Sequence, residues 1–148
     1  MSDSPNATIS TVCSAPLTLN EACITEFAEQ FDPQPYHLDK QAGLNSIFGS
    51  LCASGWQVAA LGTRLVGDGL AKEGYTFIAL TRVETLRWKR PMFVDEDLVA
   101  KVSIVDMMPE CSVPECQTAI IEADLNNSNG ECVAVMRCHA AIDLGDDV

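Results

Sequence analysis

The sequence predicts an α+β fold in which an antiparallel β-sheet wraps around a central buried α-helix. Three observations predict it. Residues 54–66 are apolar on nearly every side of a helix, as expected for a helix buried in the middle of a domain. The second half of the chain contains four strand-like segments, rich in β-branched residues and partly alternating. Helices therefore come first and strands follow, which is typical of an α+β domain.

The length and composition predict a single globular domain. A chain of 148 residues with 47% hydrophobic and 20% charged residues is one domain of ordinary size and is not disordered. We expect residues 10–143 to form this domain, between a flexible N-terminal tail at 1–9 and an acidic C-terminal tail at 144–148. No apolar run could span a membrane, and the N-terminus does not read as a signal peptide. The sequence therefore predicts a cytoplasmic protein without a membrane partner.

Charge and cysteine content argue against nucleic-acid binding and against a metal site. The formal net charge of −12 disfavours nucleic acid as a partner. The seven cysteines show no C-x-x-C spacing, so we expect most to be small buried hydrophobes and expect no metal site. Four of the nine Lys and Arg residues fall in "RVETLRWKR", residues 82–90. This cluster either holds a polyanion against the acidic background or forms the solvated face of a strand.

The first element expected is a helix over residues 17–31, "LTLNEACITEFAEQF". Thr18 followed by Glu21 matches a capping box. One apolar stripe along the helix consists of Ile24, Phe27, Ala28 and Phe31. The helix is expected to end at the proline-rich segment, where Pro33 and Pro35 exclude a helix or a central strand.

The remaining elements follow from the same signals. Residues 40–50 are expected to be a short helix or a loop. Ser54 is the expected N-cap of the buried helix, and "GDG" at 67–69 is its expected stop. Strands are predicted at 75–88, 97–108, 116–127 and 131–144, with the turn cluster "NNSNG" between the last two.

The segment "FDPQPYHLDK" places Asp32 and His37 five residues apart in a stiff stretch of chain. Taken alone, Asp32 fits a turn or capping residue, and His37 fits a loop histidine bonded to the backbone. The alternative is a rigid mount for a carboxylate and an imidazole that act together on a substrate. We expect Asp39 to bond nearby amides and His139 to be structural.

Residues 19–143 resemble the MaoC-like dehydratases, which have the hot-dog fold and include the (R)-specific enoyl-CoA hydratases. The family pattern D-x-N-P-x-H-x-D is matched by "DPQPYHLD", residues 32–39, with Gln34 in place of the usual Asn. Phe48 stands where the family has an aromatic residue, eleven positions after the histidine. The turn "NSNGECV" matches the Asn-x-x-Gly turn before the last strand.

Two pairs of residues depart from the family pattern. Ser54-Gly55 stands where the family has His-Gly at the start of the central helix. Asp95-Glu96 stands where the family has Gly-Asp. Because of these departures, a non-catalytic acyl-CoA-binding hot-dog protein stays an alternative. A hot-dog acyl-CoA thioesterase, with a carboxylate that acts at the carbonyl carbon, is the other.

The resemblance implies a homodimer and a lyase of the (R)-specific enoyl-CoA hydratase type. Such an enzyme adds or removes water at the 2,3 double bond of an acyl-CoA thioester. The resemblance implies that Asp32 and His37 activate the water, with the division of base and acid between them open. No cofactor is expected, because coenzyme A is part of the substrate.

Other candidate residues follow from the chemistry of the reaction. The start of a helix presents free N–H groups, so we infer that those of Gly55 and Trp56 polarise the thioester oxygen. Ser54 either caps the helix or contacts substrate, and Thr63 stands where hydratases tend to have Ser. We expect Trp88 in the core or at a dimer interface. The candidate contacts to the phosphates of coenzyme A are Arg87, Lys89 and Arg90.

Overall fold

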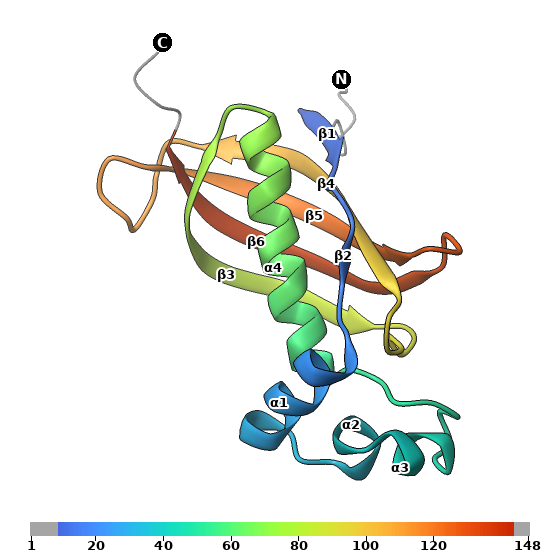
Figure 1. Ribbon diagram of the computed structural model, residues 1–148. Helices are drawn as coiled ribbons and strands as arrows, with labels where there is room; N and C mark the ends of the chain where they lie inside the picture. The colour runs from blue at the N-terminus through green and yellow to red at the C-terminus, as the bar shows by residue number, and fades with distance from the viewer. Residues whose placement is uncertain (1–8, 144–148) are drawn as a thin grey trace.

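The computed structural model describes residues 9–143 and shows one curved antiparallel sheet with a long helix across its concave face (Figure 1). The strands are β1 (Ser10–Cys13), β2 (Leu17–Thr18), β3 (Thr76–Trp88), β4 (Asp97–Met108), β5 (Gln117–Asn127) and β6 (Cys132–Asp143). Their order is β1-β4-β5-β6-β3, and β2 also pairs with β4. The predicted α+β architecture is confirmed. Of the tails expected at 1–9 and 144–148, residues 1–8 and 144–148 lie outside the described residues. The N–H of Ile9 donates to the carbonyl of Ile104 at 2.8 Å.

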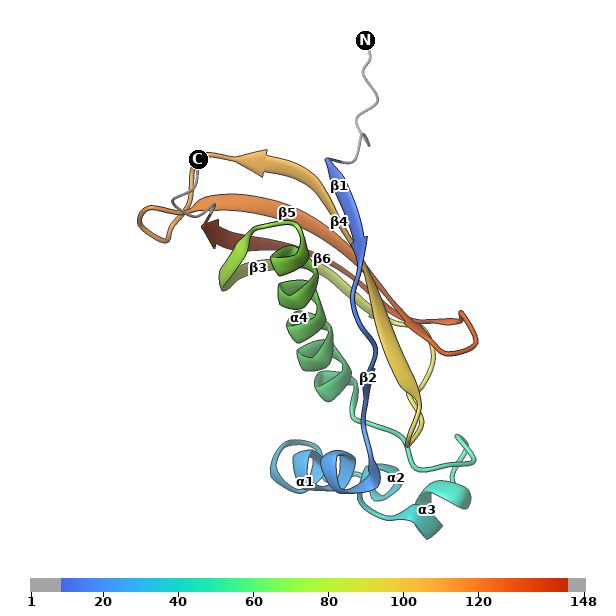
Figure 2. The ribbon, with the colours of Figure 1, turned by 45° about the horizontal axis from the view of Figure 1, so that its top comes forward.

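The helices are α1 (Glu21–Phe31), α2 (Pro35–Leu38), α3 (Lys40–Leu44) and α4 (Gly55–Lys72). Figure 2 shows that α1, α2 and α3 gather beyond the N-terminal end of α4, away from the sheet. The chain therefore has two parts, a sheet-and-helix body and a small helical cap. The start of α4 is the point at which they meet.

Helix α4 lies close to the sheet because glycines face it. A Cβ on Gly62 would lie 2.7 Å from Cδ1 of Leu125, and one on Gly69 would lie 3.0 Å from Cγ2 of Val102. The core between helix and sheet is apolar; its largest fully buried side chains include Leu65, Leu70, Leu98, Ile104, Ile121, Leu125 and Ile142. The opposite face of α4 is exposed in the single chain, so the expectation of a helix buried on all sides is met on one side only.

The start of α1 differs from the prediction. Asn20 is the N-cap, and its side chain accepts a hydrogen bond from the N–H of Cys23 at 2.9 Å. The expected capping box at Thr18 is wrong, because Thr18 lies in β2, where its hydroxyl donates to the carboxylate of Asp97. Asn is as good an N-cap as Thr, and pairing with β4 takes residues 17–18 out of the helix.

Two expectations about helix breakers are also wrong. Pro35 does not exclude a helix; it occupies the first turn of α2, where a missing N–H costs nothing. The "GDG" at 67–69 does not end α4, which continues to Lys72; Gly69 instead allows the helix to lie close to Val102 of the sheet. The chain turns at Gly74, whose φ of 86° is one that glycine adopts freely.

Two further features of the described residues bear on the sequence-based expectations. No helix within residues 9–143 is both long and apolar enough to cross a bilayer. All seven cysteines are free, but only Cys52 and Cys138 are buried. The expectation that most cysteines are buried hydrophobes is therefore wrong.

Candidate active site

The structure brings Asp32 and His37 together where the helical cap meets the body. Asp32 ends α1, and its N–H donates to the carbonyl of Ala28 at 2.9 Å. His37 lies in α2 and is 7% exposed. Nε2 of His37 is 3.5 Å from Oδ2 of Asp32. This separation is longer than an ordinary N–H···O hydrogen bond, so the two groups face one another without being joined directly.

The imidazole of His37 is fixed by its other nitrogen. Nδ1 lies 2.6 Å from the carbonyl oxygen of Cys52. A carbonyl can only accept, so Nδ1 carries the hydrogen, and Nε2 of the neutral ring is an acceptor that faces Asp32. The ring also packs edge-on against Tyr36, with ring centroids 4.6 Å apart, and Tyr36 packs against Phe48 at 5.0 Å. The backbone contact and the aromatic packing together set the direction of Nε2.

The carboxylate of Asp32 is fixed by Ser54. The hydroxyl of Ser54 donates to Oδ2 of Asp32 at 2.7 Å and accepts a hydrogen bond from the N–H of Trp56 at 3.3 Å. Ser54 is fully buried. It therefore caps α4, as predicted, and it also links the first turn of α4 to the carboxylate at the end of α1.

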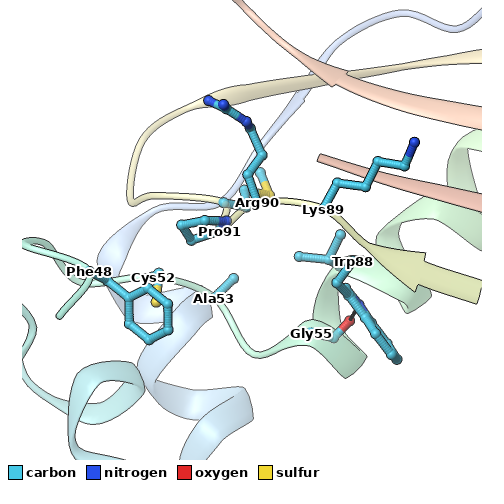
Figure 3. Close-up of a pocket in the computed structure, with 10 residues that line it drawn as sticks. Phe48, Cys52, Ala53, Gly55, Trp88, Lys89, Arg90 and Pro91 are labelled. Atoms are coloured by element: carbon cyan, nitrogen blue, oxygen red, sulfur yellow. Dashed lines mark hydrogen bonds between the residues drawn. The ribbon is translucent and has the colours of Figure 1, made fainter. Parts of the chain in front are cut away.

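A pocket of about 330 Å³ opens beside this pair. Its lining is mostly apolar: Phe48, Cys52, Ala53, Gly55, Val58, Trp88, Lys89, Arg90, Pro91 and Met92 (Figure 3). Asp32 and His37 do not line it. They contact the segment 52–55 through the carbonyl of Cys52 and the hydroxyl of Ser54, and the other residues of this segment line the pocket together with Cys52. The pair and the pocket are neighbours that share this short segment.

Gly55 is in close contact with the indole of Trp88. A Cβ on Gly55 would lie 2.9 Å from Nε1 of Trp88, and that indole N–H donates to the carbonyl of Gly55 at 2.7 Å. The indole therefore fills the side of Gly55 on which a Cβ would lie. Within residues 9–143 the N–H of Gly55 has no acceptor, whereas the N–H of Trp56 is used by Ser54.

The predicted phosphate contacts are divided by the structure. Lys89 and Arg90 line the pocket, and Arg87 does not. Nη1 of Arg90 is paired with Oε2 of Glu131 at 2.6 Å. Thr63 is also outside the pocket lining, and its hydroxyl donates to the carbonyl of Ala59 in the preceding turn of α4 at 3.0 Å. The structure therefore places Lys89 and Arg90 at the pocket, and neither Arg87 nor Thr63.

Two contributors were missed from sequence. The carbonyl of Cys52 orients His37, and a backbone contact of this kind leaves no signal in the residue types. Glu131 could have been suspected, because it directly follows the turn "NSNG".

The pKa of the Cys52 thiol is raised to about 11 by burial, so this side chain stays protonated near neutral pH. Within residues 9–143 no three His, Cys, Asp or Glu side chains gather to hold a metal ion.

Comparison with known proteins assigns the family. Residues 4–124 match the family model described as the MaoC like domain. The chain belongs to the MaoC-like dehydratase family. A solved MaoC-like dehydratase from Rhodospirillum rubrum is 30% identical, with a TM-score of 0.75 over 95% of this chain and 94% of that one. The (R)-hydratase from A. caviae involved in PHA biosynthesis is 19% identical, with a TM-score of 0.66 over 94% and 97% of the two chains.

The match to one curated relative covers a smaller share of the chain. The uncharacterized protein YdeM of Bacillus subtilis is 30% identical over 95 residues, which are 64% of this chain and 66% of that protein. The match therefore spans slightly less than two thirds of the length of that relative. The structural neighbours confirm the hot-dog fold.

At Asp95, one departure from the family pattern, the backbone has a conformation that glycine favours. Asp95 has a φ of 65°, in the left-handed region that glycine adopts without strain. Its N–H donates to the carbonyl of Leu19 at 2.9 Å, and Glu96 accepts from the N–H of Phe93 at 2.8 Å. Asp95 and Glu96 therefore form a hydrogen-bonded turn at the position where the family pattern has Gly-Asp.

Proposed function

We propose that this MaoC-like dehydratase adds or removes water at the 2,3 double bond of an acyl-CoA thioester, as an (R)-specific enoyl-CoA hydratase does. One observation carries the proposal: Asp32 and His37 face each other at 3.5 Å beside an apolar pocket, and each is held by a hydrogen bond to another group. The structural similarity to the A. caviae (R)-hydratase supports the same type of reaction. The proposed reaction needs no cofactor beyond the coenzyme A of the substrate.

The proposed mechanism uses the pair on one water. Nε2 of His37 and the carboxylate of Asp32 are both acceptors, so a water between them can donate one hydrogen to each. As the water oxygen bonds to C3, one of its protons passes to the pair, the C2–C3 double bond becomes single, and the pair delivers a proton to C2. The N–H of Gly55 is the donor that we assign to the thioester oxygen, because the N–H of Trp56 is used by Ser54.

The pocket suits the rest of an acyl-CoA. Its apolar walls, including Phe48, Val58 and Met92, fit an acyl chain or a pantetheine arm. Lys89 and Arg90 at its edge are the contacts that we propose for the phosphates. Arg87 is exposed on β3 next to them and adds positive charge without lining the pocket.

We also propose that the protein is a homodimer. Strand β3 is an edge strand, paired only with β6 among the described residues. Four of its large apolar side chains are partly exposed: Ile78, Leu80, Val83 and Trp88. A long apolar edge of this kind invites pairing with another strand. Because β3 ends at the pocket, a second copy would lie near the site. Light scattering that gave a monomer mass at all concentrations would contradict this.

The function is tested by a turnover screen over 2-enoyl-CoA thioesters of several chain lengths, with the absorbance of the conjugated bond followed in time. The expected result is hydration to the (R)-3-hydroxy product, lost in Asp32→Asn, which keeps the shape of the carboxylate. The melting temperature of this variant should fall little or rise, because functional sites hold unfavourable groups. Release of free thiol would instead indicate a thioesterase, and binding without turnover would indicate a non-catalytic protein.

A further inference from the structure

The hairpin turn between β5 and β6 is organised by one buried side chain. Oδ1 of Asn127 accepts hydrogen bonds from the N–H groups of Asn129 at 3.0 Å and Glu131 at 2.9 Å. Asn127 is 7% exposed, and Gly130 in the turn has a φ of 77°. The turn therefore fixes the backbone position of Glu131.

The carboxylate of Glu131 is held at both oxygens. Oε1 accepts from Nδ2 of Asn127 at 3.0 Å, and Oε2 pairs with Nη1 of Arg90 at 2.6 Å. The hydrogen bond from Asn127 and the positive charge of Arg90 lower the pKa of this carboxyl group. Glu131 is therefore a carboxylate at neutral pH, with a fixed direction toward Arg90.

Arg90 is consequently directed away from the pocket that its stem lines. Figure 3 shows the guanidinium on the side opposite to Phe48 and Cys52. The side chains of Arg90 and Glu131 are 46% and 43% exposed, so the pair is accessible to a competing anion. Lys89, the other cation at the pocket, has no acidic partner within residues 9–143.

We propose that Glu131 is a specificity-determining residue that holds Arg90 off the pocket and so limits how strongly the protein binds the phosphate groups of coenzyme A. The inference rests on the proposed function. While the pair is intact its net charge is zero, and a phosphate must compete with Glu131 for the guanidinium. The acyl and pantetheine parts of the substrate, which meet apolar walls, are unaffected by this competition.

The test is Glu131→Gln, which keeps the shape and an acceptor for Asn127 but removes the charge. Turnover is measured with a 2-enoyl-CoA and with the same acyl group on pantetheine, which lacks the phosphates. We expect KM for the coenzyme A thioester to fall about two- to fivefold, in line with a partly exposed ion pair, with kcat unchanged. KM for the pantetheine thioester should not change. Equal shifts for the two substrates, or no shift, would overturn the proposal.

Two control variants separate this effect from net charge. Glu122 pairs with Arg137 at 2.7 Å on the outer face of the sheet, so Glu122→Gln removes the same charge away from the pocket. It should leave the KM values of both substrates unchanged. In an Arg90→Gln background, Glu131→Gln should no longer lower KM, because the released cation is missing.

A measurement without turnover keeps this inference distinct from the proposed function. Calorimetric titration with coenzyme A should show tighter binding by Glu131→Gln than by the wild-type protein or Glu122→Gln. If no enoyl thioester is hydrated, the proposed reaction fails, and this titration still decides the role of Glu131. Equal or weaker binding of coenzyme A by Glu131→Gln would refute that role.

Discussion

The chain contains two histidines, and each faces a carboxylate, but the two pairs differ in how they are joined. Nε2 of His139 is bonded directly to Oε2 of Glu84 at 2.5 Å on the outer face of the sheet. Arg137 contacts the same carboxylate at 3.4 Å. His37 and Asp32 stand 3.5 Å apart, and each is bonded to a different partner. In the first pair the imidazole and the carboxylate bond each other, whereas in the second both groups can accept a hydrogen bond from one small molecule.

The difference shows what makes a histidine–carboxylate pair available for chemistry. The carbonyl of Cys52 holds Nδ1 of His37, and the hydroxyl of Ser54 holds Oδ2 of Asp32. These second partners hold the two groups near each other without a direct hydrogen bond. At His139 the imidazole bonds the carboxylate of Glu84 directly, and Arg137 contacts the same carboxylate. A small molecule can be shared by Asp32 and His37 and not by the outer pair.

The largest expected effect comes from exchanging the two histidines for alanine. His37→Ala should lower kcat/KM for a 2-enoyl-CoA by about 10²–10⁴-fold, or about 3–5 kcal/mol, because it removes one of the groups that act on the water. His139→Ala should leave kcat/KM unchanged, since its partner lies on the outer face of the sheet. The measurement is initial-rate kinetics on both folded variants.

Loss of turnover in a folded His139→Ala variant would contradict this difference between the two pairs. A double variant tests whether Asp32 and His37 act together. Asp32→Asn combined with His37→Ala should cost much less than the sum of the single losses, because both act on one water. Additive losses would mean that the two side chains act at separate steps.

A smaller effect is expected at Ser54, where capping and orientation can be separated. Ser54→Ala removes both the N-cap and the bond to Asp32, whereas Ser54→Gly removes the bond but keeps a residue that caps well. Both variants should lower kcat, by about tenfold, as for a lost orienting contact. Ser54→Ala should also lose about 1 kcal/mol of unfolding free energy, and Ser54→Gly only a few tenths. Urea unfolding read beside initial rates tests this, and an unchanged kcat in both variants would rule out the orienting role.

The smallest effect concerns stability at the outer pair. The hydrogen bond from His139 and the charge of Arg137 lower the pKa of Glu84 below its ordinary value of 4.5. A lowered pKa adds stability above the ordinary value, and this is lost as pH falls through the folded value. The urea midpoint of the wild-type protein should therefore exceed that of Glu84→Gln at about pH 6. The difference should vanish in acid, and a constant difference would show that the charge of Glu84 is not the cause.

The long strands could be predicted because each carries its own pattern. Strand β4 was placed at its observed bounds from alternation and β-branched residues alone. Strands β1 and β2 were not predicted, since they are short and are formed only by pairing with β4 far along the chain. The stop expected at Gly69 failed for a similar reason: whether a glycine ends a helix or fits against Val102 depends on the sheet.

The site was predictable where spacing carries the information. Asp32 and His37 could be paired from one short motif, and the structure brings them together. The roles of neighbouring residues depend on tertiary contacts. The indole of Trp88 against Gly55, and the turn that aims Glu131 at Arg90, join segments more than thirty residues apart. No local pattern could have revealed them.

The contact between Trp88 and Gly55 has a spectroscopic consequence. The chain has two tryptophans, and they lie together at the start of α4 with ring centroids 5.2 Å apart. Trp88 lines the pocket, so a molecule that enters it changes the polarity around one of these two indoles. Intrinsic tryptophan fluorescence should therefore report occupancy of the pocket directly, without a dye and without background from tryptophans elsewhere in the chain. Rapid mixing with coenzyme A could then follow the binding step in real time, separately from any reaction.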